Sequence, residues 1–182
     1  DDYFPRDVFD KLCELGVTSL TVPEEYGGSG KDMMATIAII EELASRSLGI
    51  ASGFIFCACY AGLNISEAAS EAQKQELLPK VAKGKMLFSY GISEPDVGAD
   101  VASVRTKAVI DGDEVIINGT KRWCSGPNVT DFIYTIVRSG PEEDRYRNLS
   151  LILIPPKAKG ITIEVQQTLG QKGVGGTCDV TF

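Results

Sequence analysis

Two short segments carry residues whose types and spacing could bind a planar or phosphorylated ligand. The first, YGISEPDVGADVAS, runs from Tyr90 to Ser103 and turns at Pro95 and Gly98 between two predicted strands. Backbone N–H groups in a glycine turn, with short hydroxyl side chains nearby, can bind a phosphate or the edge of a heterocycle. A plain β-turn explains the same residues, because Gly and Pro punctuate most turns.

The second segment is INGTKRWCSG, from Ile117 to Gly126. Its Asn-Gly pair, Asn118 and Gly119, predicts a hairpin, and turn geometry alone would explain it. Trp123 is the single tryptophan of the chain. It could anchor a core, which is the more common role, or offer a flat wall for a ring, with Ser125 as a hydrogen-bond donor to that ring.

Other kinds of chemistry are excluded or disfavoured by composition. The chain has no histidine, which excludes a Ser-His-Asp centre, a Cys-His centre and any histidine-ligated metal within it. The cysteines are odd in number and contain no C-x-x-C pair, which argues against a disulfide framework and a zinc site. Free thiols in a reducing compartment are the simpler interpretation. The five cysteines are Cys13, Cys57, Cys59, Cys124 and Cys178.

The bulk numbers are those of an ordinary globular protein, with 182 residues, 43% hydrophobic and 24% charged. The formal net charge of −7 disfavours a large surface for nucleic acid or anionic membrane. We expect no membrane span, because the most apolar stretch, Gly49 to Ile65, is short and rich in small residues. The first residues do not resemble a signal peptide.

The elements that position these segments fall into two kinds. Residues 1–84 read as an all-helical domain. The first predicted helix begins near Pro5 and ends at Gly16, and the second runs from Asp32 to about Ser47. A third occupies the apolar stretch 49–70, and a fourth covers 71–84, where Pro79 kinks or breaks it. The helix after Asp32 has an apolar stripe formed by Ile37, Ile40, Leu43 and Ala44.

Residues 85–182 read as a β domain. Short β-rich runs alternate with turn signals: MLFSYGI, VRTKAVI, the turn DGDE, VIIN, FIYTIVR, LSLILI, GITIEV and DVTF. This pattern predicts an antiparallel barrel or sandwich, and therefore an α+β protein. The chain opens on Asp1 directly before a helix and stops at Phe182 within a predicted strand, so we expect the natural protein to continue.

These segments together resemble the acyl-CoA dehydrogenase family. That family has a Y-x-(V/I)-(S/T)-E-P-x-x-G-(S/A)-D loop and, some 25 residues later, an N-G-x-K-x-W-(I/C)-(S/T) segment. PEEYGG, from Pro23 to Gly28, and the order of α domain then β domain also fit. The resemblance covers essentially the whole chain, and it implies that the family's C-terminal helical domain is absent from it.

The resemblance implies an FAD site. Residues of the first segment would face the pyrimidine side of the flavin or its pyrophosphate, and residues of the second would lie at the ring near N5, the atom that receives the hydride. These residues are Tyr90, Ile92 and Ser93 at the pyrimidine, Gly98 and Ala99 at the pyrophosphate, and Trp123, Cys124 and Ser125 at the ring. Glu94 and Asp100 also match the motif, and we interpret them as groups that brace the loop.

Three positions depart from the commonest family residues. Ala99 stands where many members have Ser, so one hydroxyl contact to the pyrophosphate or to the pantetheine of a substrate is missing. Ser125 replaces Thr, and its hydroxyl can do the same work. Gly175 stands where Arg is frequent, which puts any charge contact from that position in doubt.

The family reaction is the α,β-dehydrogenation of an acyl-CoA thioester, in which a carboxylate base removes the α-proton. The resemblance places that base in the missing domain, so no residue of this chain is nominated as catalytic, Glu24, Glu25, Glu41 and Glu42 included. The resemblance implies that the apolar helix around Ile55 to Leu63 lines the acyl cavity. By offset from Tyr90, we expect Gly53, Phe56 and Tyr60 to face that cavity. The bulk of Phe56 and Tyr60 predicts a short, branched or cyclic acyl group, although two rings that merely pack the core explain the same residues.

The resemblance further implies FAD as cofactor, an electron-transfer flavoprotein as acceptor, a homotetramer, and a cytoplasmic or, in a eukaryote, mitochondrial-matrix location. Two alternatives stay open. One is a relative on the same fold, such as an acyl-CoA oxidase, nitroalkane oxidase or flavin monooxygenase. The other is a structural subunit that binds no flavin.

Overall fold

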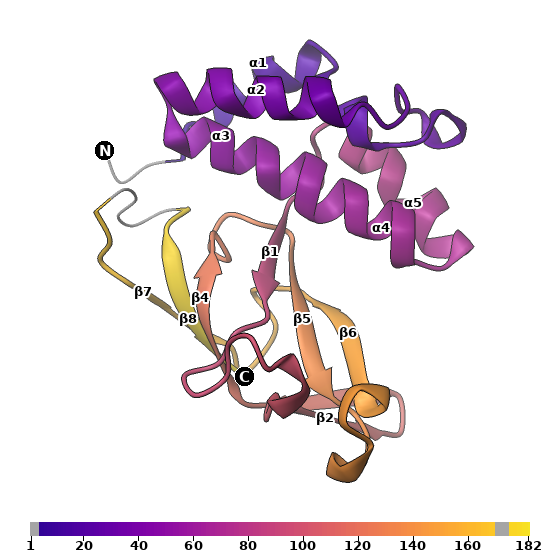
Figure 1. Cartoon of the computed structure of the whole chain (residues 1–182), viewed down its shortest axis with the longest axis vertical. Coiled ribbons are helices and arrows are strands. Elements are labelled where there is room, and N and C mark those ends of the chain that lie inside the picture. The colour runs from indigo at the N-terminus through magenta and orange to yellow at the C-terminus, as the bar shows by residue number, and fades with distance from the viewer. Residues whose placement is uncertain (1–3, 170–174) are drawn as a thin grey trace. The chain divides into compact units, whose positions relative to one another are not determined.

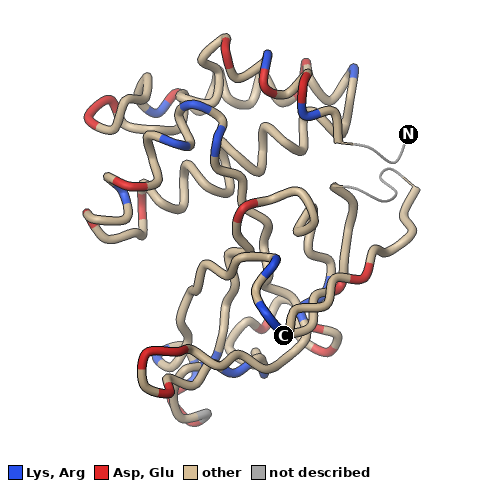
Figure 2. The backbone as a smooth tube through the Cα atoms, turned by 180° about the vertical axis from the view of Figure 1, so that it is seen from behind, with Lys and Arg blue, Asp and Glu red and all other residues tan. Residues whose placement is uncertain are grey.

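The protein is described by a computed structural model that covers residues 4–169 and 175–182 (Figure 1). The chain divides between Phe88 and Ser89 into two compact units, which are described separately below. The first unit is helical and the second contains all the described strands. Basic and acidic residues are interspersed along the backbone of each unit (Figure 2).

The α unit is built from helices joined by short 3₁₀ turns. In chain order these are α1 (Arg6–Glu14), η1 (Val17–Thr21), η2 (Glu24–Tyr26), α2 (Met33–Arg46), α3 (Leu48–Phe54), the π-helix η3 (Ile55–Leu63), α4 (Asn64–Ala68) and α5 (Glu71–Ala82).

Side-chain caps mark the helix starts that the sequence predicts. Asp32 accepts a hydrogen bond from the Ala35 amide at 2.9 Å, and Ser70 and Gln73 form a reciprocal capping box at the start of α5. Gly16 follows α1 with φ 78°, a left-handed conformation that costs glycine little. Pro79 lies inside α5, which continues through it to Ala82, so this proline does not divide the helix.

The predicted apolar stripe of α2 was only partly right. Thr36 is fully buried, and Ile40 and Leu43 are partly buried beside it. Ile37 is 48% exposed and Ala44 is exposed as well. The helix therefore turns its Thr36 side inward, where the Thr36 hydroxyl donates to the Asp32 carbonyl at 2.7 Å within the same helix.

The helical segments α3, η3 and α4 follow one another without a break from Leu48 to Ala68. By length and composition alone these 21 residues could cross a membrane, so the expectation that no apolar run is long enough was wrong on length. In the structure 56% of its most apolar window is buried inside the protein. A mostly buried apolar helix is typical of a folded core.

The π-helical turns of η3 are supported by side chains from outside them. The Thr21 hydroxyl donates to the Ala58 carbonyl at 2.7 Å, and the side-chain Nδ2 of Asn64 donates to the Tyr60 carbonyl at 2.7 Å. These bonds supply hydrogen-bond donors to backbone carbonyl oxygens in a helix whose wider π turns depart from the regular α-helical hydrogen-bond pattern. Gly62 permits the first one, since a Cβ at that position would lie 2.3 Å from the Thr21 hydroxyl.

The β unit contains two sheets that are not closed into a barrel. Its strands are β1 (Phe88–Gly91), β2 (Lys107–Asp111), β3 (Glu114–Asn118), β4 (Thr120–Ser125), β5 (Phe132–Arg138), β6 (Leu149–Ile154), β7 (Thr162–Val165) and β8 (Thr177–Thr181), with 3₁₀ turns η4 (Val101–Ser103) and η5 (Glu142–Asn148). One sheet has the order β1-β5-β2-β3 with β6 also on β5, and the other has the order β4-β8-β7.

Most of the strand pairings whose registers are described are antiparallel. β2–β3, β5–β6, β4–β8 and β7–β8 pair antiparallel, while β2 meets β5 in parallel where Lys107 lies opposite Arg138. The predicted turn at DGDE is confirmed, with Gly112 at φ 62° between β2 and β3, which pair antiparallel. The buried cluster Cys124, Ile133 and Val180 draws on both sheets.

The hairpin predicted at Asn118-Gly119 was wrong. β3 pairs with β2, whereas β4 pairs with β8, so the chain passes here from one sheet to the other. Gly119 is needed for close approach, because a Cβ there would lie 2.6 Å from the Thr106 Cα. The strand β4 itself was not predicted, since its sequence TKRWCS lacks alternation of apolar and polar residues.

Candidate functional site

The two candidate segments of the sequence are joined by a buried ion pair. The Nζ of Lys121, in β4, lies 2.9 Å from the Oε1 of Glu94, in the loop after β1, and it also donates to the Ile92 carbonyl at 3.0 Å. The side chains are 0% and 5% exposed. Two segments that are separate in sequence therefore form a single assembly in the β unit.

Glu94 is hydrogen-bonded on both carboxylate oxygens. Oε1 accepts from the amide and the hydroxyl of Thr106, and Oε2 accepts from the Arg105 amide at 2.8 Å. Burial acts to raise the pKa of Glu94, but the hydrogen bonds from Thr106, Lys121 and the backbone outweigh it and hold the pKa below its ordinary value. Burial lowers the pKa of Lys121, an effect that Glu94 partly offsets. The interpretation of Glu94 as a loop-bracing group is confirmed.

Two arginines hold the other end of the same loop. The buried guanidinium of Arg138 donates to the Ala102 carbonyl at 2.6 Å, to the Val104 carbonyl at 2.9 Å and to the Asn148 side chain at 2.8 Å. Asp100 accepts from the Ser103 hydroxyl at 2.6 Å and from Arg145 at 3.3 Å. Asp100 thus braces the loop as expected.

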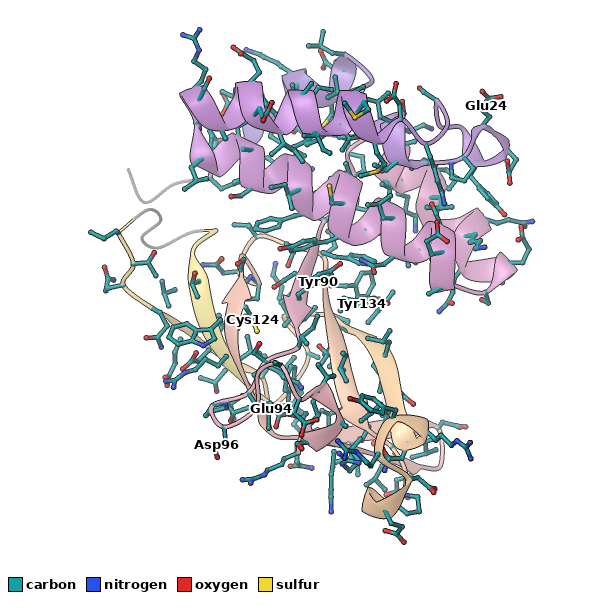
Figure 3. The ribbon with its side chains drawn as sticks, in the orientation of Figure 1. Glu24, Tyr90, Glu94, Asp96, Cys124 and Tyr134 are labelled. Carbon is teal, nitrogen blue, oxygen red and sulfur yellow. The ribbon has the colours of Figure 1, made fainter. Side chains whose placement is uncertain are left out.

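Between these anchors, the loop presents an exposed turn. Gly98 and Ala99 are both exposed, and a Cβ built on Gly98 meets no atom within 4 Å. The backbone there is open to solvent. Tyr90, in β1, and Ile92 and Ser93, in the following residues, are partly exposed. The Tyr90 ring lies 5.7 Å from the Tyr134 ring, centroid to centroid (Figure 3).

Trp123 occupies an unusual position in β4. This residue is 59% exposed, and its φ of 63° lies in the left-handed region, which costs a bulky L-residue roughly 1–2 kcal/mol. The β4–β8 register shifts between Lys121 and Cys124, so a β-bulge contains it. Bulges beside active sites often redirect a side chain. The interpretation of Trp123 as a core anchor was wrong, because the ring lies at the surface of the β unit.

Arg122 contacts both segments. Its backbone N–H donates to the Ser93 carbonyl at 2.8 Å, its guanidinium lies 5.1 Å from the centroid of the Trp123 ring, and its Nε lies 3.2 Å from Oδ2 of Asp179 in β8. The resemblance gave no role to Arg122, and no periodicity marks it. It was missed because a basic residue in a strand is usually a solvated one.

The side chains of the two residues after Trp123 lie on opposite faces of the strand. Cys124 is fully buried in the apolar cluster with Ile133 and Val180, so its thiol is turned away from any ligand that lies on the indole. Burial raises the pKa of Cys124 to about 12. Ser125 is partly exposed, on the strand face opposite to Cys124. Cys124 can contact a cofactor only through its backbone.

The residues expected at the acyl cavity belong to the α unit. Phe56 and Tyr60 lie on η3 with ring centroids 5.7 Å apart; Phe56 is 2% exposed and Tyr60 is partly exposed. The expectation for Gly53 was wrong. A Cβ on Gly53 would lie 2.7 Å from Cζ of Phe4 and 3.2 Å from the Phe9 ring, so this glycine faces the N-terminal aromatic pair and not a cavity.

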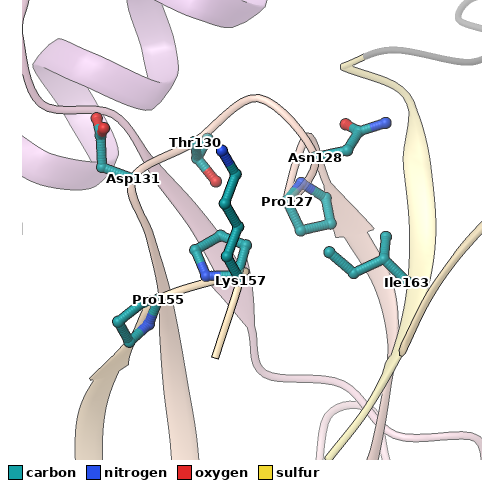
Figure 4. A pocket seen from close by; sticks show the side chains of 8 residues that line it. Pro127, Asn128, Thr130, Asp131, Pro155, Lys157 and Ile163 are labelled. Atoms are coloured by element: carbon teal, nitrogen blue, oxygen red, sulfur yellow. The ribbon is translucent and has the colours of Figure 1, made fainter. Parts of the chain in front are cut away.

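A hollow of about 410 Å³ lies between two loops of the β unit (Figure 4). It contains none of the predicted cofactor residues. The hydroxyl of Thr130 is buried in its wall without a hydrogen-bond partner among the described residues. Its lining residues are Pro127, Asn128, Thr130, Asp131, Pro155, Pro156, Lys157 and Ile163.

Comparison with known proteins identifies both units. Residues 1–85 match the family model of the N-terminal domain of acyl-CoA dehydrogenases, and residues 89–182 match that of the middle domain. The chain belongs to the acyl-CoA dehydrogenase family. Members of this family depend on FAD.

Among related acyl-CoA dehydrogenases, the (2S)-methylsuccinyl-CoA dehydrogenase of Cereibacter sphaeroides is 34% identical over 95% of this chain and 31% of its own length. The short-chain-specific acyl-CoA dehydrogenase of Clostridium acetobutylicum is 33% identical over 98% of this chain and 47% of its own. A solved structure of an electron transferring flavoprotein of Acidaminococcus fermentans matches with a TM-score of 0.88, 25% identity, and coverage of 100% of this chain and 47% of that one. The chain thus spans less than half the length of these relatives.

Proposed function

We propose that the whole protein is an FAD-dependent dehydrogenase that introduces a double bond between the α and β carbons of an acyl-CoA thioester. One observation carries this proposal: the Arg122 amide bonds to the Ser93 carbonyl at 2.8 Å within a bulge that leaves Trp123 59% exposed. A flat ring and a hydroxyl loop beside it suit an isoalloxazine.

Different residues of this chain would bind different parts of the cofactor. Trp123 would lie against the flavin ring, with the Ser125 hydroxyl and the Cys124 backbone near N5. Tyr90, Ile92 and Ser93 would bind the pyrimidine edge through backbone groups and the Ser93 hydroxyl. Gly98 and Ala99 would bind the pyrophosphate through their exposed amides, and Ala99 would also lie at the pantetheine of the substrate. Bound FAD supplies the acceptor for the β-hydrogen and its electron pair.

The α-proton requires a base that this chain does not supply. That proton is weakly acidic, so the site must polarise the thioester carbonyl and place a carboxylate in a dry position. Glu24, Glu41 and Glu42 are exposed, and Glu94 is committed to Lys121 and to backbone amides. We place the base in a further domain of the whole protein, where the resemblance to the family puts it.

Phe56 and Tyr60 favour a short, branched or cyclic acyl group, since two adjoining rings reduce the room for a long chain. Similarity to enzymes named for (2S)-methylsuccinyl-CoA and for short chains supports this choice. Similarity to the Acidaminococcus structure supports an electron-transfer flavoprotein as the acceptor. We further propose a homotetramer in the cytoplasm or, in a eukaryote, the mitochondrial matrix.

The test is the visible spectrum of the full-length protein, recorded without oxygen before and after addition of butyryl-CoA, isobutyryl-CoA and palmitoyl-CoA. A flavin band that bleaches with the short substrates supports the proposal. Faster bleaching with palmitoyl-CoA contradicts the acyl preference alone. A flavin band that persists with every acyl-CoA overturns the dehydrogenase reaction.

Two further outcomes identify the alternatives. Rapid reoxidation of the reduced flavin by O₂ indicates an oxidase or monooxygenase on the same fold. Absence of any flavin band, even after FAD has been added, indicates a structural subunit. The missing hydroxyl at Ala99 is the residue-level observation that favours weak binding.

A further inference from the structure

The bulge in β4 has a defined opposite residue. Lys121 lies opposite Val180 and Cys124 lies opposite Cys178, so Arg122 and Trp123 together face Asp179. In such a bulge two residues on one strand oppose one on its partner, and the local ladder is interrupted. The Arg122 amide is consequently free of the ladder, and it bonds to the Ser93 carbonyl at 2.8 Å.

The side chain of Arg122 contacts both Asp179 and Trp123. Its Nε lies 3.2 Å from Oδ2 of Asp179, while its guanidinium carbon lies 5.1 Å from the centroid of the Trp123 ring. The planar guanidinium suits both partners, because it can bond a carboxylate with its edge and attract an aromatic face at the same time. The Arg122 side chain is 37% exposed and that of Asp179 is 14% exposed.

Asp179 also has an acidic neighbour. Glu164 of β7 lies directly opposite Asp179 in the β7–β8 ladder, and carboxylates at directly opposite positions repel each other. Arg122 compensates for this repulsion. The charge arrangement therefore favours the observed position of Arg122 over a fully solvated one.

We propose that Arg122, anchored by Asp179, is a positioning residue that holds the Trp123 indole in the orientation needed to bind a flavin ring. The inference rests on the proposed function, which supplies the flavin. It adds that position 122, between Lys121 and Trp123, requires a cationic side chain, whose carboxylate partner Asp179 lies on another strand.

The experiment uses the full-length protein with Arg122→Met, Arg122→Lys, Asp179→Asn and the double variant Arg122→Met with Asp179→Asn. Arg46→Met is the matched control, because Arg46 forms an exposed ion pair with Glu42 in the α unit. Near-ultraviolet circular dichroism of the FAD-free protein, taken as the difference from Trp123→Phe, reports the order of the indole. Titration with FAD gives the dissociation constant, and urea unfolding verifies that each variant folds.

We expect Arg122→Met and Asp179→Asn to lose most of the Trp123 dichroism and to bind FAD about 3- to 10-fold more weakly, the range of a lost cation–π contact. The double variant should match Arg122→Met, since both changes remove one arrangement. Arg122→Lys should recover part of each signal, and Arg46→Met should change neither.

An unchanged Trp123 dichroism in folded Arg122→Met overturns the inference. Loss of the Trp123 dichroism with an unchanged dissociation constant for FAD also overturns the inference. That result would mean that Arg122 orders the indole but that FAD binding does not depend on this order. If the parent protein binds no FAD, the proposed function fails. The positioning of the indole is then still decided by the dichroism, which needs no cofactor.

Discussion

Glu94 and Lys121 form an ion pair at 2.9 Å whose side chains are 5% and 0% exposed. Each side chain also bonds to the backbone of a neighbouring segment, Lys121 to Ile92 and Glu94 to Arg105 and Thr106. The pair thus connects the loop after β1 to β4 and to the start of β2. Removal of either partner would leave an uncompensated charge in the interior of the β unit.

Glu94→Gln and Lys121→Met should each destabilise the protein by about 3–5 kcal/mol, the cost of breaking a buried pair. The measurement is urea unfolding of the full-length protein. Glu42→Gln is the control, because its pair with Arg46 is 74% and 81% exposed and should contribute less than about 0.5 kcal/mol. The double variant Glu94→Leu with Lys121→Met should lose less than the sum of the single changes. Single losses below about 1 kcal/mol would contradict the buried-pair argument.

The pH dependence of stability should carry the signature of Glu94. Its pKa in the folded state lies below the ordinary value of 4.5, so the unfolded chain takes up the proton first as the solution is acidified. The stabilisation is complete above about pH 4.5 and is lost as pH falls through the folded-state pKa. Between pH 3 and pH 6, the free energy of unfolding measured with urea should fall less steeply with decreasing pH for Glu94→Gln than for the parent. Equal slopes for the two proteins would contradict this prediction.

Gly62→Ala should destabilise the α unit by about 1–3 kcal/mol, since the added Cβ would lie 2.3 Å from the Thr21 hydroxyl. Thr21→Ala alone should also destabilise, because the Ala58 carbonyl would lose its 2.7 Å partner. In the double variant the clash is absent, so the two losses should not add. A thermodynamic cycle from thermal unfolding measures this coupling. Additive losses would show that Thr21 and Gly62 act independently.

Cys124 and Cys178 should resist alkylation in the native protein. Both are fully buried, and burial raises the pKa of Cys124 to about 12 and that of Cys178 to about 11. Since the thiolate is the reactive form, the raised pKa values of both cysteines keep their thiols protonated and unreactive near pH 8. Treatment with iodoacetamide followed by peptide mass spectrometry should find both about 100-fold slower than in urea. Comparable rates in the native and unfolded protein would contradict their burial in the core.

Strong local patterns were predictable from the sequence. The runs FIYTIVR and LSLILI coincide with β5 and β6, because long apolar runs bounded by turn residues have few other uses. Asp32 and Ser70 were equally clear as N-cap residues, since a hydroxyl or carboxylate just before a helical segment accepts hydrogen bonds from the first backbone amides of the helix. The motif residues of the cofactor site followed from their resemblance to a family and not from physical pattern.

What could not be predicted depends on contacts between distant segments. Glu94 and Lys121 are ordinarily surface residues, and only the assembled fold shows that their charges are paired. The strand β4 has no apolar alternation, because its bulge turns Trp123 outward beside the buried Cys124. The π-helix η3 is apolar on nearly every side, so its wider turns leave no mark in the sequence.

The pairing of β4 also has a consequence for biosynthesis. In the described part of the chain, its ladder partner is β8, and Thr120 lies opposite Thr181 across 61 residues of sequence. A ribosome makes those residues in several seconds, at roughly 5–20 residues per second. Throughout that interval the strand that carries Trp123 has emerged without its neighbour. A nascent chain therefore completes its β5–β6 hairpin before it acquires a surface that could hold a flavin.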